Sequence, residues 1–124
     1  MPFGGLAFDI AGDVAVVDPS DRGSLCDGEE GLPQFIATLL EQGFSKVLLD
    51  LHRIEYIDSL ALGGIVHAHR SVTRRGGKLR IVNVARRVRE LFEQTRLASA
   101  FDIVGSRDVA LRLFEATVSS ETEA

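Results

Sequence analysis

The sequence predicts one α/β domain in which an N-terminal β-hairpin is followed by alternating helices and strands that form a mixed sheet flanked by helices. Three observations lead to this class. Two β-like runs flank a Gly-Asp pair near the start, short apolar runs then alternate with segments of helical period, and 124 residues with 45% hydrophobic content suffice for one core. Because strand-helix-strand units favour right-handed crossovers, we expect part of the sheet to be parallel.

The first half of the chain is predicted to contain the hairpin, a loop and a helix. Residues 6–17 form two β-like runs, and the intervening Gly12 and Asp13 favour a two-residue turn because glycine accepts a positive φ. Residues 18–31 are polar, glycine-rich and acidic, so we expect a mobile loop there. An amphipathic helix then ends near Gly43, and its apolar side is formed by Leu32, Phe35, Ile36, Leu39 and Leu40.

Three short strands are predicted in the second half of the chain. Residues 46–51 are an apolar run in which Asp50 is the only acid, which favours a strand buried on both faces. We expect this strand to be central in the sheet. Residues 78–84 and 101–104 predict two further strands, each of which follows a helical segment.

Capping and breaking residues bound the remaining helices. Asp58 or Ser59 stands before a segment of helical period that ends at residues 75–77, and either side chain can accept hydrogen bonds in a first turn. Ser106 is the predicted cap of the last helix. Val88, Leu91, Phe92 and Thr95 mark the third helix, and Val109, Ala110, Leu113 and Phe114 are expected to face inward in the last one.

Composition narrows the function classes. A single cysteine, Cys26, excludes an intrachain disulfide and a zinc site built on several cysteines. No apolar run is long enough to span a bilayer, and residues 1–5 lack the pattern of a secretory signal, so we expect a cytoplasmic protein without membrane insertion. We assign residues 1–116 to the domain and residues 117–124 to a polar, flexible tail.

The stretch from Asp50 to Gly63 carries the most specific pattern in the chain. It reads Asp50-Leu51, then Ile54, then Tyr56-Ile57-Asp58-Ser59, then Leu62-Gly63. This pattern resembles the signature of the STAS family, the bacterial anti-sigma factor antagonists. The resemblance extends roughly from the first hairpin to the last helix, and it implies a STAS-type topology.

The resemblance also implies a modification site. In that family the serine directly after the aspartate is phosphorylated by a partner kinase that is itself the anti-sigma factor, and the matching position here is Ser59. The family commonly has a second serine and then a glycine, where this chain has Leu60 and Ala61. These departures weaken the match at the partner-facing turn, whereas Asp58 and Gly63 preserve it. On sequence chemistry alone, a helix cap is the favoured role of Ser59, and the resemblance reverses that preference.

The helix that follows Asp58 has two unlike sides. At about 100° per residue, Leu62, Ile65, Val66, His69 and Val72 fall on the core side, and Leu60, Gly63, Gly64, His67, Ser71 and Arg74 fall on the other. Each glycine lowers helix stability by roughly 1 kcal/mol relative to alanine, but together they offer a low surface that another backbone can approach. We hypothesise that a partner docks on Asp58, Ser59, Leu60, Gly63, Gly64 and His67. The alternative is that the glycines only relieve crowding against a neighbouring element of the same chain.

The residues disfavour catalysis and nucleic-acid binding. His67 and His69 are two positions apart on a helix and cannot share a metal, and Ser59 lacks the Gly-x-Ser-x-Gly frame of a hydrolase. Basic residues without any acid lie between Arg70 and Arg89, but the chain has a net charge of −4 and the cluster contains no aromatic residues. We expect solvated faces that could steer an acidic partner, and a non-enzymatic protein with no cofactor and no metal.

Together, the residues and the resemblance predict a partner-switching protein. Unphosphorylated, it would bind an anti-sigma factor that has serine kinase activity and thereby free the sigma factor. Phosphorylation at Ser59 would release it, and a phosphatase could reverse the modification. The alternative is a STAS scaffold of a stress-signalling complex, or a soluble STAS subunit of a lipid or anion transporter.

Overall fold

The computed structural model describes residues 6–28 and 30–123, with side chains described as far as residue 115. Residues 1–5, on which the prediction about a secretory signal rests, lie outside the described part. In chain order the elements are β1 (Leu6–Ala11), β2 (Val14–Pro19), the 3₁₀ helix η1 (Arg22–Leu25), α1 (Leu32–Glu41), β3 (Lys46–Asp50), α2 (Ser59–Arg74), β4 (Lys78–Val82), α3 (Arg86–Gln94), β5 (Asp102–Val104) and α4 (Arg107–Glu123).

The five strands form one mixed sheet in the order β1-β2-β3-β4-β5, which confirms the predicted α/β class. β1 and β2 are antiparallel and join through Gly12 and Asp13, with Ala11 opposite Val14. Gly12 has a φ of +63°, the conformation for which glycine was expected. The remaining neighbours are parallel. β3 is third in the order of five strands and is therefore the central strand, as predicted.

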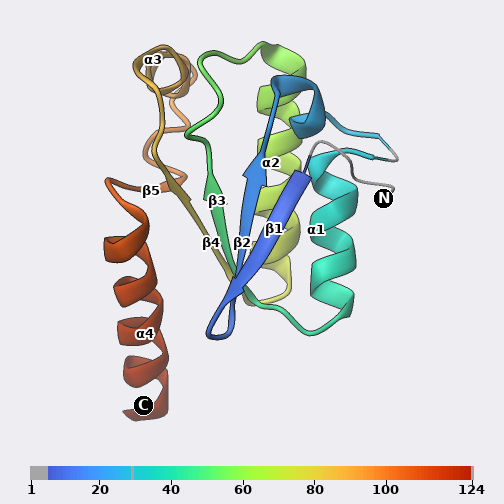
Figure 1. Cartoon of the computed structure of the whole chain (residues 1–124). Helices are drawn as coiled ribbons and strands as arrows, with labels where there is room; N and C mark the ends of the chain where they lie inside the picture. Colours follow the sequence, from blue (N-terminus) through green and yellow to red (C-terminus); the bar gives the residue numbers. More distant parts are fainter. Residues whose placement is uncertain (1–5, 29, 124) are drawn as a thin grey trace.

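Helices cover both faces of the sheet. Figure 1 shows α1 and α2 on one face and α4 on the other. Alternate residues of β3 point to the two sides: Val47 and Leu49 belong to the larger core beneath α1 and α2, and Leu48 belongs to a smaller core with Phe114 of α4. The prediction that the central strand is buried on both faces is therefore confirmed.

The inward face of α4 is narrower than predicted. Ala110 and Phe114 are buried against the sheet, but Val109 is 44% exposed and Leu113 is 39% exposed. The reason is that α4 is the one described helix on its face of the sheet (Figure 1), so the flanks of its buried stripe have no neighbouring helix to cover them. The Oγ of Ser106 accepts a hydrogen bond from the N–H of Val109 at 3.3 Å, as expected of a cap.

β4, the loop after β2 and α4 differ from the expectations, and β3 and β5 are each one residue shorter than predicted. β4 ends at Val82 because Asn83 has a φ of +58°, which is incompatible with a continuing strand. The loop after β2 is more ordered than predicted, since η1 lies within it and places Leu25 in the core at 0% exposure. The backbone of α4 continues to Glu123, and the flexible tail at residues 117–124 stays a prediction, with Ala124 outside the described part.

A buried carboxylate ties the ends of the central strands to α4. Asp50, 2% exposed, accepts hydrogen bonds at Oδ1 from the His52 backbone N–H and Asn83 Nδ2, both at 3.0 Å, and at Oδ2 from Arg107 Nη2 at 2.7 Å. Burial by itself raises the pKa of Asp50, but the hydrogen bonds from Asn83, Arg107 and His52 outweigh it, so the pKa lies below its ordinary value. Asp50 therefore stays ionised and fixes the start of the connection that leads to α2.

Candidate functional site at the N-terminus of α2

The connection between β3 and α2 is anchored at two apolar positions. Ile54 is 3% exposed and Ile57 is 8% exposed, so both side chains are held in the core. Asp58 adopts an extended conformation directly afterwards, and its Oδ1 accepts a hydrogen bond from the Ala61 N–H at 2.9 Å. Asp58 is therefore the N-cap of α2, which decides between the two capping residues that the sequence allowed.

Ser59 is the first residue of α2 and is exposed. Because the Asp58 side chain caps the first turn, the cap does not require the Ser59 hydroxyl. Within residues 6–28 and 30–115, that hydroxyl makes no hydrogen bond to another side chain or to the backbone. The structure thus places an exposed and unengaged hydroxyl at the positive end of a helix of 16 residues.

An open surface continues from Ser59 along α2. Leu60 is 72% exposed, the highest value among the exposed large hydrophobic residues of the described chain. Gly63 has open space where a Cβ would stand, and His67 lies one turn further along the same side. We call the surface formed by Ser59, Leu60, Gly63 and His67 the Ser59 face.

Gly64 does not belong to this face, which corrects its predicted placement. It is buried, and an added Cβ would lie 1.7 Å from the carbonyl oxygen of Leu25 and 3.1 Å from the Cα of Cys26. The absence of a side chain lets the end of η1 approach the helix backbone. The alternative explanation, relief of crowding within the chain, is therefore correct for Gly64, whereas Gly63 has no such neighbour.

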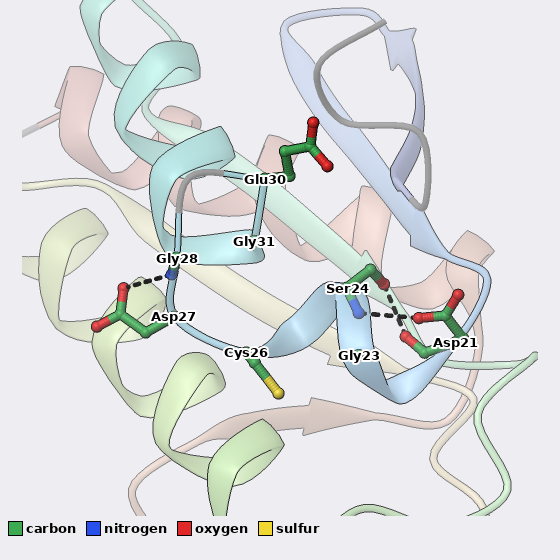
Figure 2. A pocket seen from close by; sticks show the side chains of 8 residues that line it. All are labelled: Asp21, Gly23, Ser24, Cys26, Asp27, Gly28, Glu30 and Gly31. Atoms are coloured by element: carbon green, nitrogen blue, oxygen red, sulfur yellow. Dashed lines mark hydrogen bonds between the residues drawn. The ribbon is translucent and has the colours of Figure 1, made fainter.

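The loop after η1 supports the Ser59 face from the side. His67 Nδ1 lies 3.2 Å from Asp27 Oδ2, and this pair joins α2 to the loop. Figure 2 shows that Asp27 also accepts a hydrogen bond from the Gly28 N–H, and that Asp21 accepts one from the Ser24 N–H. Asp21 and Asp27 line a cavity of about 350 Å³, and each carboxylate accepts a hydrogen bond from the loop's own backbone.

Two arginines contact the ring of Tyr56, and the sequence interpretation did not include these contacts. The guanidinium carbon of Arg22 lies 4.5 Å from the ring centroid of Tyr56, and that of Arg87 lies 5.5 Å from the same ring. Arg22 Nε is also 3.9 Å from Asp58 Oδ2. Tyr56 was part of the recognised pattern, but no local signal pairs it with arginines from two distant segments.

Two other polar residues singled out in the sequence, His69 and Arg80, do not belong to the Ser59 face. His69 is half-buried with its ring 5.3 Å from that of Phe101, and burial lowers its pKa, followed by the charge of Lys78. Arg80 is 5% exposed, and its Nε lies 2.9 Å from Asp102 Oδ2. The prediction of a solvated face is therefore wrong for this member of the basic cluster. In the described part of the chain, no group of three His, Cys, Asp or Glu residues could hold a metal ion.

No helix among the described residues combines the length and the apolar character needed to cross a bilayer.

Comparisons with known proteins agree with this geometry. Residues 27–116 match the STAS domain family model. BtrV of Bordetella bronchiseptica, a candidate anti-sigma factor antagonist, is 30% identical over 86 residues, which are 69% of this chain and 74% of that protein.

Two solved structures show the same fold. The crystal structure of a candidate anti-sigma factor antagonist from Thermotoga maritima superposes with a TM-score of 0.73 at 24% identity, over 90% of this chain and 95% of that one. The phosphorylated form of SpoIIAA from Bacillus gives a TM-score of 0.65 at 16% identity, over 87% of this chain and 98% of that one. The protein described here belongs to the STAS domain family, in the group of anti-sigma factor antagonists.

Proposed function

We propose that this protein binds an anti-sigma factor with serine kinase activity through the Ser59 face, and that phosphorylation of Ser59 releases it. One observation carries the proposal. Asp58 caps α2, so the exposed Ser59 hydroxyl at the first helical position makes no hydrogen bond within the described part of the chain. It lies next to the exposed Leu60, and Gly63 follows one turn later with open space where a Cβ would stand. The likeness of the fold to a protein solved in a phosphorylated form supports the same reading.

A phosphate on Ser59 would leave the fold intact. It would add a charge of about −1.5 to −2 at the N-terminal end of α2, where the helix dipole and the first-turn N–H groups favour an anion. The neighbouring Asp58 is a like charge, and Arg22 Nε lies 3.9 Å from its Oδ2. The modification therefore acts on binding, not on folding.

Binding would weaken for two physical reasons. The phosphate is strongly hydrated, so burying it at the rim of an apolar contact carries a desolvation cost. It would also repel any acidic side chain of the partner. A combined loss of about 3 kcal/mol lowers the affinity more than a hundredfold, which is enough to release a partner bound with micromolar affinity.

The test begins with the protein isolated from its native cells. Intact-mass and phosphopeptide analysis is expected to find one phosphate on Ser59 that disappears in a Ser59→Ala variant. Ser71→Ala, on the same helix, is the matched control and should keep the phosphate. The kinase-like anti-sigma factor of the same genome should phosphorylate the wild type in vitro and leave Ser59→Ala unmodified.

Partner capture tests the second half of the proposal. Wild type and Ser59→Ala should retain the anti-sigma factor, whereas Ser59→Asp should retain at least tenfold less. Circular dichroism and thermal unfolding of the three proteins check that the fold is unchanged. A Ser59 that stays unmodified under every growth condition, or equal capture by Ser59→Asp, would contradict the switch.

A further inference from the structure

A cavity lies beside the C-terminal half of α2, away from Ser59. Its volume is about 320 Å³, at the lower end of the range for small-molecule sites. Val66, Arg70 and Arg74 line it from α2, and Leu97, Ala100 and Phe101 line it from the segment between α3 and β5. Most of the wall surface is therefore apolar, and the charged groups come from one helix.

The floor of the cavity is rigid. Phe101 is 5% exposed and meets the ring of Phe92 edge to face at 5.1 Å and the ring of His69 at 5.3 Å. The segment that carries it is fixed to α3 by a hydrogen bond from the Leu97 N–H to the Phe92 carbonyl at 2.8 Å. The apolar wall is thus formed before any ligand arrives.

The interior has no free charge. Burial, and then the charge of Lys78, lower the pKa of His69, so its imidazole is neutral at neutral pH. The Thr73 hydroxyl donates to the His69 carbonyl at 2.8 Å and is already engaged. No carboxylate lines the cavity. An apolar body would meet little desolvation cost inside it.

The rim carries two arginines. Arg70 and Arg74 are four positions apart, so they stand one turn apart on the same side of α2, and both are exposed. Neither has an ion-pair partner among the residues that the structure describes, although five other arginines do. A guanidinium binds a carboxylate through two parallel N–H donors, so this pair suits one small anion.

We propose that this cavity binds a small monocarboxylic acid with an apolar tail. The tail would lie against Leu97, Ala100 and Phe101, and the carboxylate would lie between Arg70 and Arg74. The site is independent of Ser59 and of the proposed switch, so it can be tested whether or not Ser59 is phosphorylated.

The first experiment titrates the ¹⁵N-labelled full chain with octanoate and follows amide shifts by NMR. We expect saturable shifts at Val66, Leu97 and Ala100, with no comparable change at Leu60. Octylammonium has the same tail with the opposite charge and should bind at least tenfold more weakly. Acetate has the charge without the tail and should also bind at least tenfold more weakly.

Variants distinguish the contribution of the two rim arginines to octanoate binding from that of the apolar wall. The double variant Arg70→Gln/Arg74→Gln should weaken octanoate binding at least tenfold. Arg89→Gln/Arg112→Gln removes the same charge from exposed positions on α3 and α4, and it should leave the affinity within twofold. Ala100→Trp places a ring over the wall from an exposed position and should abolish binding while preserving the spectrum elsewhere.

A vesicle experiment distinguishes an acid held in a membrane from an acid free in solution, and three outcomes would contradict the proposal. Cosedimentation with phosphatidylcholine vesicles that contain oleate would identify a membrane-held acid, and octanoate binding without cosedimentation would identify a free one. Unsaturable shifts, or equal affinity for octanoate and octylammonium, would overturn the site. So would a loss of anti-sigma factor binding in Arg70→Gln/Arg74→Gln without any octanoate binding by the wild type, because the cavity would then be a protein contact.

Discussion

The two sides of α2 each contain a glycine, but the two glycines have different surroundings. On the packed side, Gly64 lets the carbonyl of Leu25 approach the helix, and Ala61 and Ala68 are fully buried beside it. On the open side, a Cβ added at Gly63 would meet no atom of another element within 4 Å, and Leu60 is 72% exposed. Small residues on the packed side contribute to stability through close contact. Gly63 on the open side lowers helix stability, and no close contact within the described chain compensates for it.

The largest effect should follow from Gly64→Ala. The new methyl group would overlap the Leu25 carbonyl oxygen, 1.7 Å away, so either η1 or α2 must move. We expect a loss of about 3 kcal/mol in the free energy of unfolding, as for an overpacked core. Urea denaturation followed by circular dichroism measures it. A variant as stable as the wild type would show that the packed side of α2 tolerates volume.

The stripe of large apolar residues did not separate these two glycines. At 100° per residue both fall outside that stripe, but Ala61 and Ala68, which were not counted in it, are buried on the side of Gly64. The 3₁₀ helix η1 comes from a loop whose composition indicates mobility, so its contact with α2 had no local signal. Leu25, fully buried within an acidic segment, is the one residue that could have suggested it.

The sheet, by contrast, was predictable. The β1-β2 hairpin, its Gly12 turn and the apolar run of β3 each depend on neighbours in sequence, and the structure contains all three. The apolar alternation in β1 does not match burial, because Leu6 is buried whereas Phe8 and Ile10 are exposed. The recognised pattern located Asp58 and Ser59. Contacts between distant segments were not predictable, such as Arg22 on Tyr56, because nothing in either segment's local pattern encodes the other.

The second largest loss of stability should follow from a substitution of Asp50, which lies at the start of the connection between β3 and α2. Asp50→Asn keeps the shape of the side chain but removes its charge-assisted hydrogen bonds, above all the one from Arg107 Nη2 at 2.7 Å. We expect a loss of about 2 kcal/mol at neutral pH, the magnitude for hydrogen bonds to a charged group. Urea denaturation of the variant and the wild type gives the difference.

The pH dependence of that difference follows from the sign of the pKa shift. The pKa of Asp50 is lower in the folded protein than in the unfolded chain, where it is about 3.9. The stabilisation is therefore fully present above the unfolded pKa and is lost as the pH falls through the folded value. The gap between wild type and Asp50→Asn should close in acid. A gap that stays constant down to acidic pH would mean that the ionised carboxylate is not its source.

A smaller effect of opposite sign is expected for Gly63→Ala. A methyl group at Gly63 meets no atom within 4 Å, so the helix should gain about 1 kcal/mol. The same methyl group would stand on the Ser59 face and hold a partner's backbone away. A more stable protein that binds the anti-sigma factor more weakly is the expected result. Unchanged binding would remove Gly63 from the docking surface.

The smallest change in stability should come from His67→Ala. Its pair with Asp27 is solvent-exposed, with side-chain exposures of 52% and 71%, and such pairs contribute less than about 1 kcal/mol. Asp27→Asn is the matched control, because it weakens the same pair from the loop side without altering the Ser59 face. Reduced partner binding in His67→Ala but not in Asp27→Asn would assign His67 to the partner contact. Equal reductions of partner binding in the two variants would instead assign the effect to the position of the loop after η1, and not to a contact between the partner and the His67 imidazole.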